Sequence, residues 1–200
     1  MITIIDYGAS NIKSLSNAIQ YLGYKFRIVN KKKELFKSDK IILPGVGAFD
    51  IAIKNLKKDK LDLAIKNHCN KGGAILGICL GMQLLGNYSF ENGKNKGLSL
   101  VNGVTKRFAF KKKISIPHIG YNSITFNFKS KLFNKVEDNS FFYFSNSYHF
   151  VNEENIVSSY CNYGGPFVSS VEKKNIFGVQ FHPEKSHKNG LQVLLNFINI

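Results

Sequence analysis

A cysteine between two glycines is the pattern with the clearest chemical meaning in this chain. The segment Gly77-Ile78-Cys79-Leu80-Gly81 ends an apolar run and continues into Met82-Gln83-Leu84-Leu85, which is typical of a helix. A nucleophile on a sharp strand-to-helix turn needs small neighbours, because larger side chains would clash there. The N-terminus of the following helix favours a thiolate, and the Leu80 N–H is placed to donate to an oxyanion. We therefore expect a nucleophilic cysteine, with a buried structural cysteine as the alternative.

A histidine and a carboxylate two residues apart could supply the proton transfers that this nucleophile needs. His182 follows the apolar run 176–181, Pro183 stops the strand, and Glu184 comes next. We expect His182 to accept and return protons and Glu184 to orient its imidazole. No histidine has convincing zinc spacing with cysteines or carboxylates, so we expect no metal site.

A glycine-rich turn after another apolar strand is a candidate for further oxyanion donors. Pro44-Gly45-Val46-Gly47-Ala48-Phe49 follows the run 41–43. Glycines let the main chain turn and direct N–H groups toward a ligand, so Val46 and Gly47 are expected to contribute to an oxyanion hole. Taken alone, the segment is also compatible with an ordinary strand-to-helix turn.

The elements that must position these residues alternate between strands and helices in the first half of the chain. Apolar runs predict strands, and helical spacing of apolar residues predicts helices over 11–22 and 51–67. Strands that are apolar on both faces, alternating with helices, indicate a parallel sheet covered on both sides. The expected strands of this half are 2–5, 25–29, 40–43 and 74–78.

The second half has a different pattern, with short strands and turns. It predicts β-like stretches over 97–128 with a turn at 117–120, an aromatic strand over 140–150, and a final helix over 190–200. The segments 168–172 and 176–181 are expected to pair across Lys173-Lys174-Asn175.

Length and composition restrict the class of protein. The chain has 200 residues and 44% hydrophobic residues, which suits a single domain over 1–200 and excludes a disordered chain. No run approaches the ~20 apolar residues that span a bilayer, so no membrane association is expected. The absence of a recognisable signal peptide and the odd number of cysteines, three, favour a reducing, cytoplasmic location.

The net charge of the chain raises the question of whether it binds nucleic acid. The chain carries 28 Lys+Arg and 13 Asp+Glu, a formal net charge of +15. Its lysines lie in short runs scattered between apolar segments, and no nucleic-acid-binding motif accompanies them. We interpret the charge mainly as compositional bias and keep a basic nucleic-acid-binding protein as a distant alternative.

The two motifs around Cys79 and His182 resemble the signatures of the class I, triad-type glutamine amidotransferases. The resemblance implies a flavodoxin-like three-layer α/β fold, in which helices flank a mostly parallel sheet and antiparallel strands are added in the C-terminal half. It implies a triad of Cys79, His182 and Glu184 that hydrolyses glutamine through a thioester, without a cofactor. It also implies an oxyanion hole at Gly47 and Leu80. The positions that would hold L-glutamine are Gly47, Gln83, Ser147 and Tyr148.

Further segments resemble one branch of this family, whose members pass ammonia to a (β/α)₈-barrel cyclase subunit in histidine biosynthesis. They are 6–8, 44–49, 117–122, 143–144 with 147–148, and 182–186. In that branch the chain would form a heterodimer with the cyclase, and Asn11, His118 and Lys185 would face it. Tyr121 and Asn146 depart from the branch, which commonly has Trp and His there. A paralogous branch that supplies ammonia for surface-polysaccharide sugars is the alternative.

Overall fold

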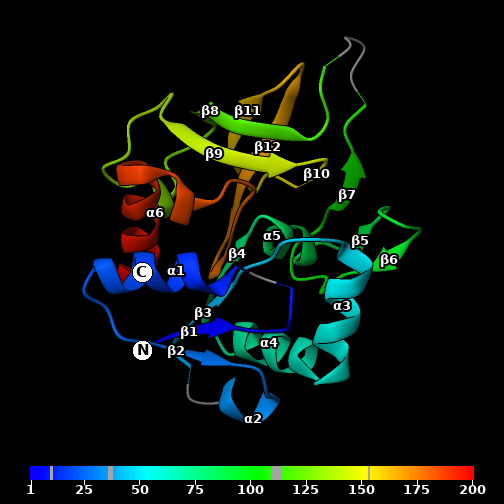
Figure 1. Ribbon diagram of the computed structural model, residues 1–200, viewed down its shortest axis with the longest axis vertical. Helices are drawn as coiled ribbons and strands as arrows, with labels where there is room; N and C mark the ends of the chain where they lie inside the picture. The colour runs from blue at the N-terminus through cyan, green and yellow to red at the C-terminus, as the bar shows by residue number, and fades with distance from the viewer. Residues whose placement is uncertain (10, 36–37, 110–113, 153) are drawn as a thin grey trace.

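Four strands from the N-terminal half of the chain and one from its C-terminal half form a parallel sheet in the computed structural model (Figure 1), which describes residues 1–9, 11–35, 38–109, 114–152 and 154–200. Its strands run in the order β2-β1-β3-β4-β13, and each neighbouring pair is parallel. Their bounds are Phe26–Val29 for β2, Ile2–Ile5 for β1, Lys40–Leu43 for β3, Ala74–Ile78 for β4 and Ile176–Val179 for β13. The parallel sheet expected from the apolar runs is confirmed.

Helices cover both faces of this sheet because its strands are apolar on both sides. Ile41 and Ile75 point to one face and pack with α3, α4 and α5, whereas Ile42 and Leu76 point to the other and pack with α1 and α6. The three-layer arrangement follows from this alternation. The helices are α1 (Ile12–Tyr21), α2 (Lys32–Leu35), α3 (Phe49–Lys58), α4 (Leu61–Asn70), α5 (Leu80–Leu84) and α6 (His187–Asn199).

The helix expected over 51–67 is two helices, so that prediction is wrong in its extent. The break lies between α3 and α4, where Lys60 has a φ of 55°. A left-handed residue cannot continue an α-helix, and it lets α4 begin with the fully buried Leu61.

Further strands extend the sheet, and their pairings are antiparallel except that of β5 with β7, which is parallel. Strand β12 (Pro166–Lys173) pairs antiparallel with β13, as the sequence predicts, and leads to β10, β7, β5 and β6. A second branch runs from β12 through β11 and β8 to β9 (Figure 1). The remaining bounds are β5 (Tyr88–Ser89), β6 (Asn95–Lys96), β7 (Val104–Arg107), β8 (His118–Phe126), β9 (Phe141–Asn146), β10 (Tyr148–Val151) and β11 (Val157–Asn162), with 3₁₀ helices η1 (Lys131–Phe133) and η2 (Pro183–Lys185).

One expected turn is part of a strand instead. Residues 118–120, expected in a turn, begin β8, where His118 pairs with Asn146 and Gly120 with Phe144 of β9. Across the described parts of the chain, no helix is both long and apolar enough to cross a membrane.

Candidate active site

Cys79 occupies a strained turn between β4 and α5. Its φ of 53° and ψ of −110° lie in a region that residues other than glycine rarely adopt. The Cys79 N–H donates to the Val179 carbonyl oxygen over 2.8 Å, so the turn is anchored on the neighbouring strand β13. Its side chain is 6% exposed. The turn therefore holds the sulfur at the C-terminal edge of the parallel sheet.

The glycines on either side of Cys79 are required by close main-chain packing. A Cβ on Gly77 would lie 2.7 Å from the main chain of Gly81 and Met82. A Cβ on Gly81 would overlap the Leu43 carbonyl oxygen and lie 2.9 Å from its carbonyl carbon. The expectation that the cysteine needs small neighbours is thus explained by the contact of α5 with β3 and β4.

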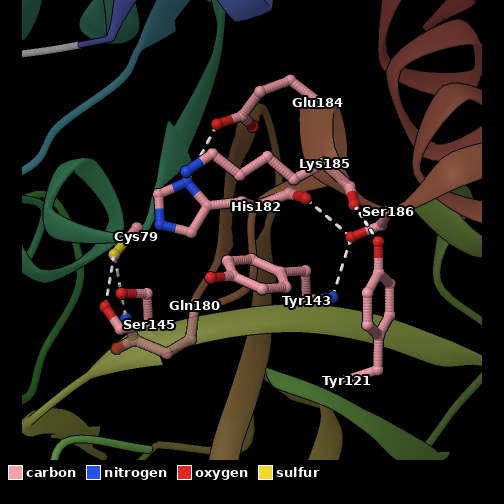
Figure 2. Close-up of polar contacts among 9 residues, drawn as sticks. All are labelled: Cys79, Tyr121, Tyr143, Ser145, Gln180, His182, Glu184, Lys185 and Ser186. Carbon is pink, nitrogen blue, oxygen red and sulfur yellow. Dashed lines mark hydrogen bonds and ion pairs between the residues drawn. The ribbon is translucent and has the colours of Figure 1, made fainter. Parts of the chain in front are cut away.

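His182 and Glu184 form a buried pair facing Cys79 (Figure 2). His182 Nδ1 and Glu184 Oε1 are 2.9 Å apart, and the two side chains are 4% and 5% exposed. Burial opposes a charged imidazole, but the Cys79 thiolate and the Glu184 carboxylate outweigh it and raise the pKa of His182 to about 10. The arrangement can hold a thiolate–imidazolium pair, with a proton on His182 available for a leaving group.

A serine hydroxyl fixes the main chain that carries this histidine. Ser186 Oγ donates to the His182 carbonyl oxygen over 2.6 Å and accepts from the Tyr143 N–H over 2.9 Å. Tyr121 Oη donates to the Lys185 carbonyl oxygen over 2.7 Å. These bonds tie η2 to β8 and β9 (Figure 2).

A cavity of about 260 Å³ opens beside Cys79 and His182. It brings together the sequence-predicted residues Val46, Gly47, Leu80, Gln83, Ser147, Tyr148 and Lys185. Other lining residues escaped the sequence prediction: Glu91, Pro117, Ser145 and Asn146. A larger cavity of about 520 Å³, between η1 and the end of α6, has no cysteine or histidine among the described residues that line it.

Two buried glutamines connect this cavity to the sulfur. Gln83 Nε2 donates to the Tyr148 carbonyl oxygen over 3.1 Å and to Gln180 Oε1 over 3.0 Å. Gln180 Nε2 in turn donates to Cys79 Sγ over 3.6 Å. Sequence reasoning missed Gln180, although it lies two residues before His182.

The two segments expected to form the oxyanion hole differ in whether a main-chain N–H is available to donate to an oxyanion. Leu80 is the first residue of α5, a position whose N–H has no partner within the helix. The Val46 N–H, in contrast, donates to the Ala9 carbonyl oxygen over 2.9 Å, so in this conformation it does not serve an oxyanion. Gly47 has a φ of 91° and lines the cavity.

Glu91 is the acidic side chain among the described residues lining the cavity. Its Oε2 accepts from the Phe49 N–H at the start of α3 over 2.9 Å, and burial raises the pKa of its carboxyl group. No motif surrounds Glu91 in the sequence, and only the fold brings it near Cys79.

Two of the three residues expected at a partner interface lie on the surface. Asn11 and Lys185 are exposed, and Lys185 Nζ lies 5.4 Å from the centre of the Tyr143 ring. The prediction for His118 is wrong, because its side chain is 3% exposed and stacks on Phe144 and Tyr163. Burial lowers the pKa of His118 to about 4. The turn that would have exposed it is strand β8.

Within the described ranges, no three His, Cys, Asp or Glu side chains are grouped so that they could hold a metal ion.

Comparisons with known proteins show similarity along the whole chain. The model of the family "Glutamine amidotransferase class-I" matches residues 3–200. "Imidazole glycerol phosphate synthase subunit HisH 2" of Methanococcus maripaludis is 45% identical, over 99% of this chain and 98% of that protein. "Imidazole glycerol phosphate synthase hisHF, chloroplastic" of Arabidopsis thaliana is 40% identical, over 100% of this chain and 34% of that protein. A solved structure titled "Crystal structure of glutamine amidotransferase" has a TM-score of 0.78 at 16% identity, covering 100% of this chain and 98% of that one.

Proposed function

Since the chain belongs to the class I glutamine amidotransferases, we propose that it is the glutaminase subunit of an imidazole glycerol phosphate synthase in histidine biosynthesis. The observation that carries the proposal is the buried pair of His182 and Glu184 facing Cys79 beside a cavity, in a chain 45% identical to a relative of that name. In this proposal residues 1–200 act as one glutaminase domain.

The first half of the reaction forms a thioester. The Cys79 thiolate attacks the side-chain amide carbon of glutamine, and charge develops on the carbonyl oxygen near the Leu80 N–H. The C–N bond then breaks while the His182 imidazolium gives its proton to the departing nitrogen, which leaves as ammonia. Glu184, 2.9 Å from Nδ1, keeps the Nε2 side of the ring toward Cys79 and stabilises its positive charge.

The second half releases glutamate. His182, now neutral, takes a proton from a water molecule that attacks the thioester carbon. The C–S bond breaks and the sulfur leaves as the thiolate, while the proton on His182 restores the thiolate–imidazolium pair. The carboxylic acid of the product loses its proton to water and leaves as glutamate. No cofactor is needed, because the acid, the base and the nucleophile are all side chains of this chain.

Glu91 is proposed to bind the α-ammonium group of glutamine, because a carboxylate in the cavity suits a positive charge. Replacing Glu91 with Gln is expected to raise KM for glutamine about 10- to 100-fold with a smaller change in kcat, since a hydrogen bond to a charged group contributes about 1.5–3 kcal/mol. Steady-state glutaminase kinetics of the complex would measure both constants. Asp50→Asn is the control, because Asp50 contacts Asn92 and does not line the cavity. An unchanged KM in Glu91→Gln would mean that this carboxylate does not bind glutamine and only accepts from the Phe49 N–H at the start of α3.

The partner in this proposal is a HisF-type (β/α)₈-barrel cyclase, bound as a heterodimer. Ammonia released into water would be protonated and lose its nucleophilicity, so a partner must cover the cavity. Ile119 and Tyr121 of β8 are 62% and 47% exposed, and they pair with Ser145 and Tyr143 of β9 next to the cavity. Lys185, exposed at the same rim, is proposed to pair with a carboxylate of the cyclase.

The hydrogen bond between Val46 and Ala9 supports a dependence on that partner. As long as the Val46 N–H donates to Ala9, the oxyanion would have the Leu80 N–H and lack a donor from Val46. Asn11 lies two residues beyond Ala9, so a partner that contacts Asn11 can act on this bond. We propose low activity for the isolated chain and full activity in the complex.

Mixing experiments test the proposed function. The purified chain is expected to hydrolyse glutamine slowly alone and at least about tenfold faster with a HisF-type cyclase and its acceptor, as one regained oxyanion donor would allow. Glutamate release and gel-filtration of the mixture measure activation and binding. Activation only by the partner of the sugar branch would replace the proposal with that alternative.

The surroundings of the enzyme are part of the proposal. Cys69, Cys79 and Cys161 are all free and buried, which supports a reducing cytoplasm. The proposal assigns no nucleic acid or membrane to the chain.

A further inference from the structure

We propose that Gln180 is a further catalytic residue, whose side-chain amide donates to Cys79 Sγ and stabilises the attacking thiolate. This inference rests on the proposed function, since it concerns the same nucleophile. Gln180 directly follows β13 and is fully buried, and its Nε2 lies 3.6 Å from the sulfur (Figure 2).

The orientation of the Gln180 amide follows from its neighbours. The Tyr148 carbonyl oxygen can only accept, so the end of Gln83 that faces it must be Nε2. The same Nε2 contacts Gln180, so Gln180 must present its oxygen there. Its nitrogen is then left facing the sulfur. A flipped amide would place its nitrogen against Gln83 Nε2, which is also a donor, and would lose that hydrogen bond, so a donor rather than an acceptor faces Cys79.

The main chain holds this donor rigidly in place. The Gln180 N–H donates to the Ser169 carbonyl oxygen of β12 over 2.8 Å. The side chain is thus attached at its backbone to β12 and at its oxygen to Gln83. A donor fixed before the reaction begins costs no reorganisation when negative charge appears on the sulfur.

Charged and polar groups other than Gln180 also lie around the sulfur. The charged ones among the described residues are His182 and Glu184, and Glu184 of η2 contacts His182 Nδ1. Tyr7 lies after β1; burial and the thiolate raise its pKa, and its hydroxyl donates to the Pro44 carbonyl oxygen. From β9 the Ser145 carbonyl oxygen lies 4.0 Å from Sγ and can only accept, which favours the thiol. Gln180 therefore supplies a neutral hydrogen-bond donor to the sulfur, and this donor stabilises the thiolate more than the thiol.

The pH profile of Cys79 alkylation by iodoacetamide tests this proposal on the free chain. Only the thiolate reacts, so the rate rises with pH through a midpoint. In Gln180→Met, similar in length but without a donor, the midpoint is expected to rise by about one pH unit or more. The rate below the midpoint falls about tenfold accordingly. Cys79→Ala gives the background from Cys69 and Cys161, whose pKa values burial raises to about 12.

Matched variants separate a role at the sulfur from a role in packing. Gln192→Met removes an amide that contacts Asn196 on α6, and it is expected to leave the midpoint unchanged. A folded Gln180→Met chain with an unchanged midpoint would overturn the proposal, even if its melting temperature fell. If Gln180→Met does not fold, Gln180→Asn decides, because the shorter amide cannot span from Gln83 to the sulfur and should shift the midpoint in the same direction.

Alkylation needs neither glutamine nor a partner, so its result is independent of the proposed function. A shifted midpoint in a chain that no cyclase activates would reject the synthase assignment and retain Gln180. Activation by the cyclase with an unshifted midpoint would retain the synthase assignment and reject the role of Gln180.

Discussion

Cys79→Ala is expected to abolish glutamine hydrolysis while the fold and partner binding survive. The variant removes the atom that forms the thioester, and a water molecule in its place lacks both the nucleophilicity and the fixed position. Losses of a catalytic nucleophile reach about 10⁴-fold or more, because the remaining residues of a triad act only together with it. Glutamate release by the complex with the cyclase would measure the loss.

The geometry of the turn explains why the fold should survive. Alanine keeps the Cβ that the φ of 53° already accommodates, so the main-chain strain is unchanged. A second assay gives a positive signal: the Cys79→Ala complex should still make the synthase product when ammonia is added, because the cyclase receives the same nucleophile. Normal glutamine-dependent activity in this variant would contradict the triad.

A cysteine outside the cavity provides the control. Cys161 of β11 is 2% exposed and packs in the core, and burial raises the pKa of its thiol to about 12. Cys161→Ala should therefore lower stability and leave glutamine hydrolysis unchanged. The contrast between the two alanine variants separates the loss of a nucleophile from the loss of a buried sulfur.

The sequence was sufficient for the parts of the site that follow directly from local pattern. The strand, the turn and the helix around Cys79 are contiguous, and His182 and Glu184 lie two residues apart at the end of another strand. Carboxyl ends of neighbouring parallel strands meet at one edge of a sheet, so pairing β4 with β13 brings the two motifs together. Here local patterns and topology agree.

Other parts of the site depend on contacts that a linear pattern does not contain. Glu91 lies in a loop near β5 and reaches the cavity only because β5 joins the sheet through β7. The hydrogen bond from the Val46 N–H to the Ala9 carbonyl oxygen joins two separate loops, so no local pattern predicts it. The sequence places His118 in a turn and at the partner interface, yet pairing with β9 makes the segment a strand and buries the side chain among aromatic rings.

Gly81→Ala is expected to destabilise the protein by about 3 kcal/mol or more, against the preference of its own helix. Gly81 lies inside α5, where alanine would be favoured over glycine by about 1 kcal/mol in an isolated helix. Its Cβ would, however, overlap the Leu43 carbonyl oxygen at the end of β3. Neither the Leu43 carbonyl group nor α5 can move away easily, because Leu43 is paired with Gly77 in the sheet and α5 is held by the turn at Cys79. The helix must shift, and the Leu80 N–H shifts with it.

Urea unfolding of the free chain measures this effect, and Gly93→Ala is the matched control. Gly93 has a φ of 101° and open space around its Cβ, so its substitution carries only the main-chain strain, about 1–2 kcal/mol. Gly81→Ala has no such strain and should nevertheless lose more stability, together with glutaminase activity in the complex. A Gly81→Ala chain as stable as the parent would mean that α5 can move away from β3. The position of the nucleophile would then not depend on that contact.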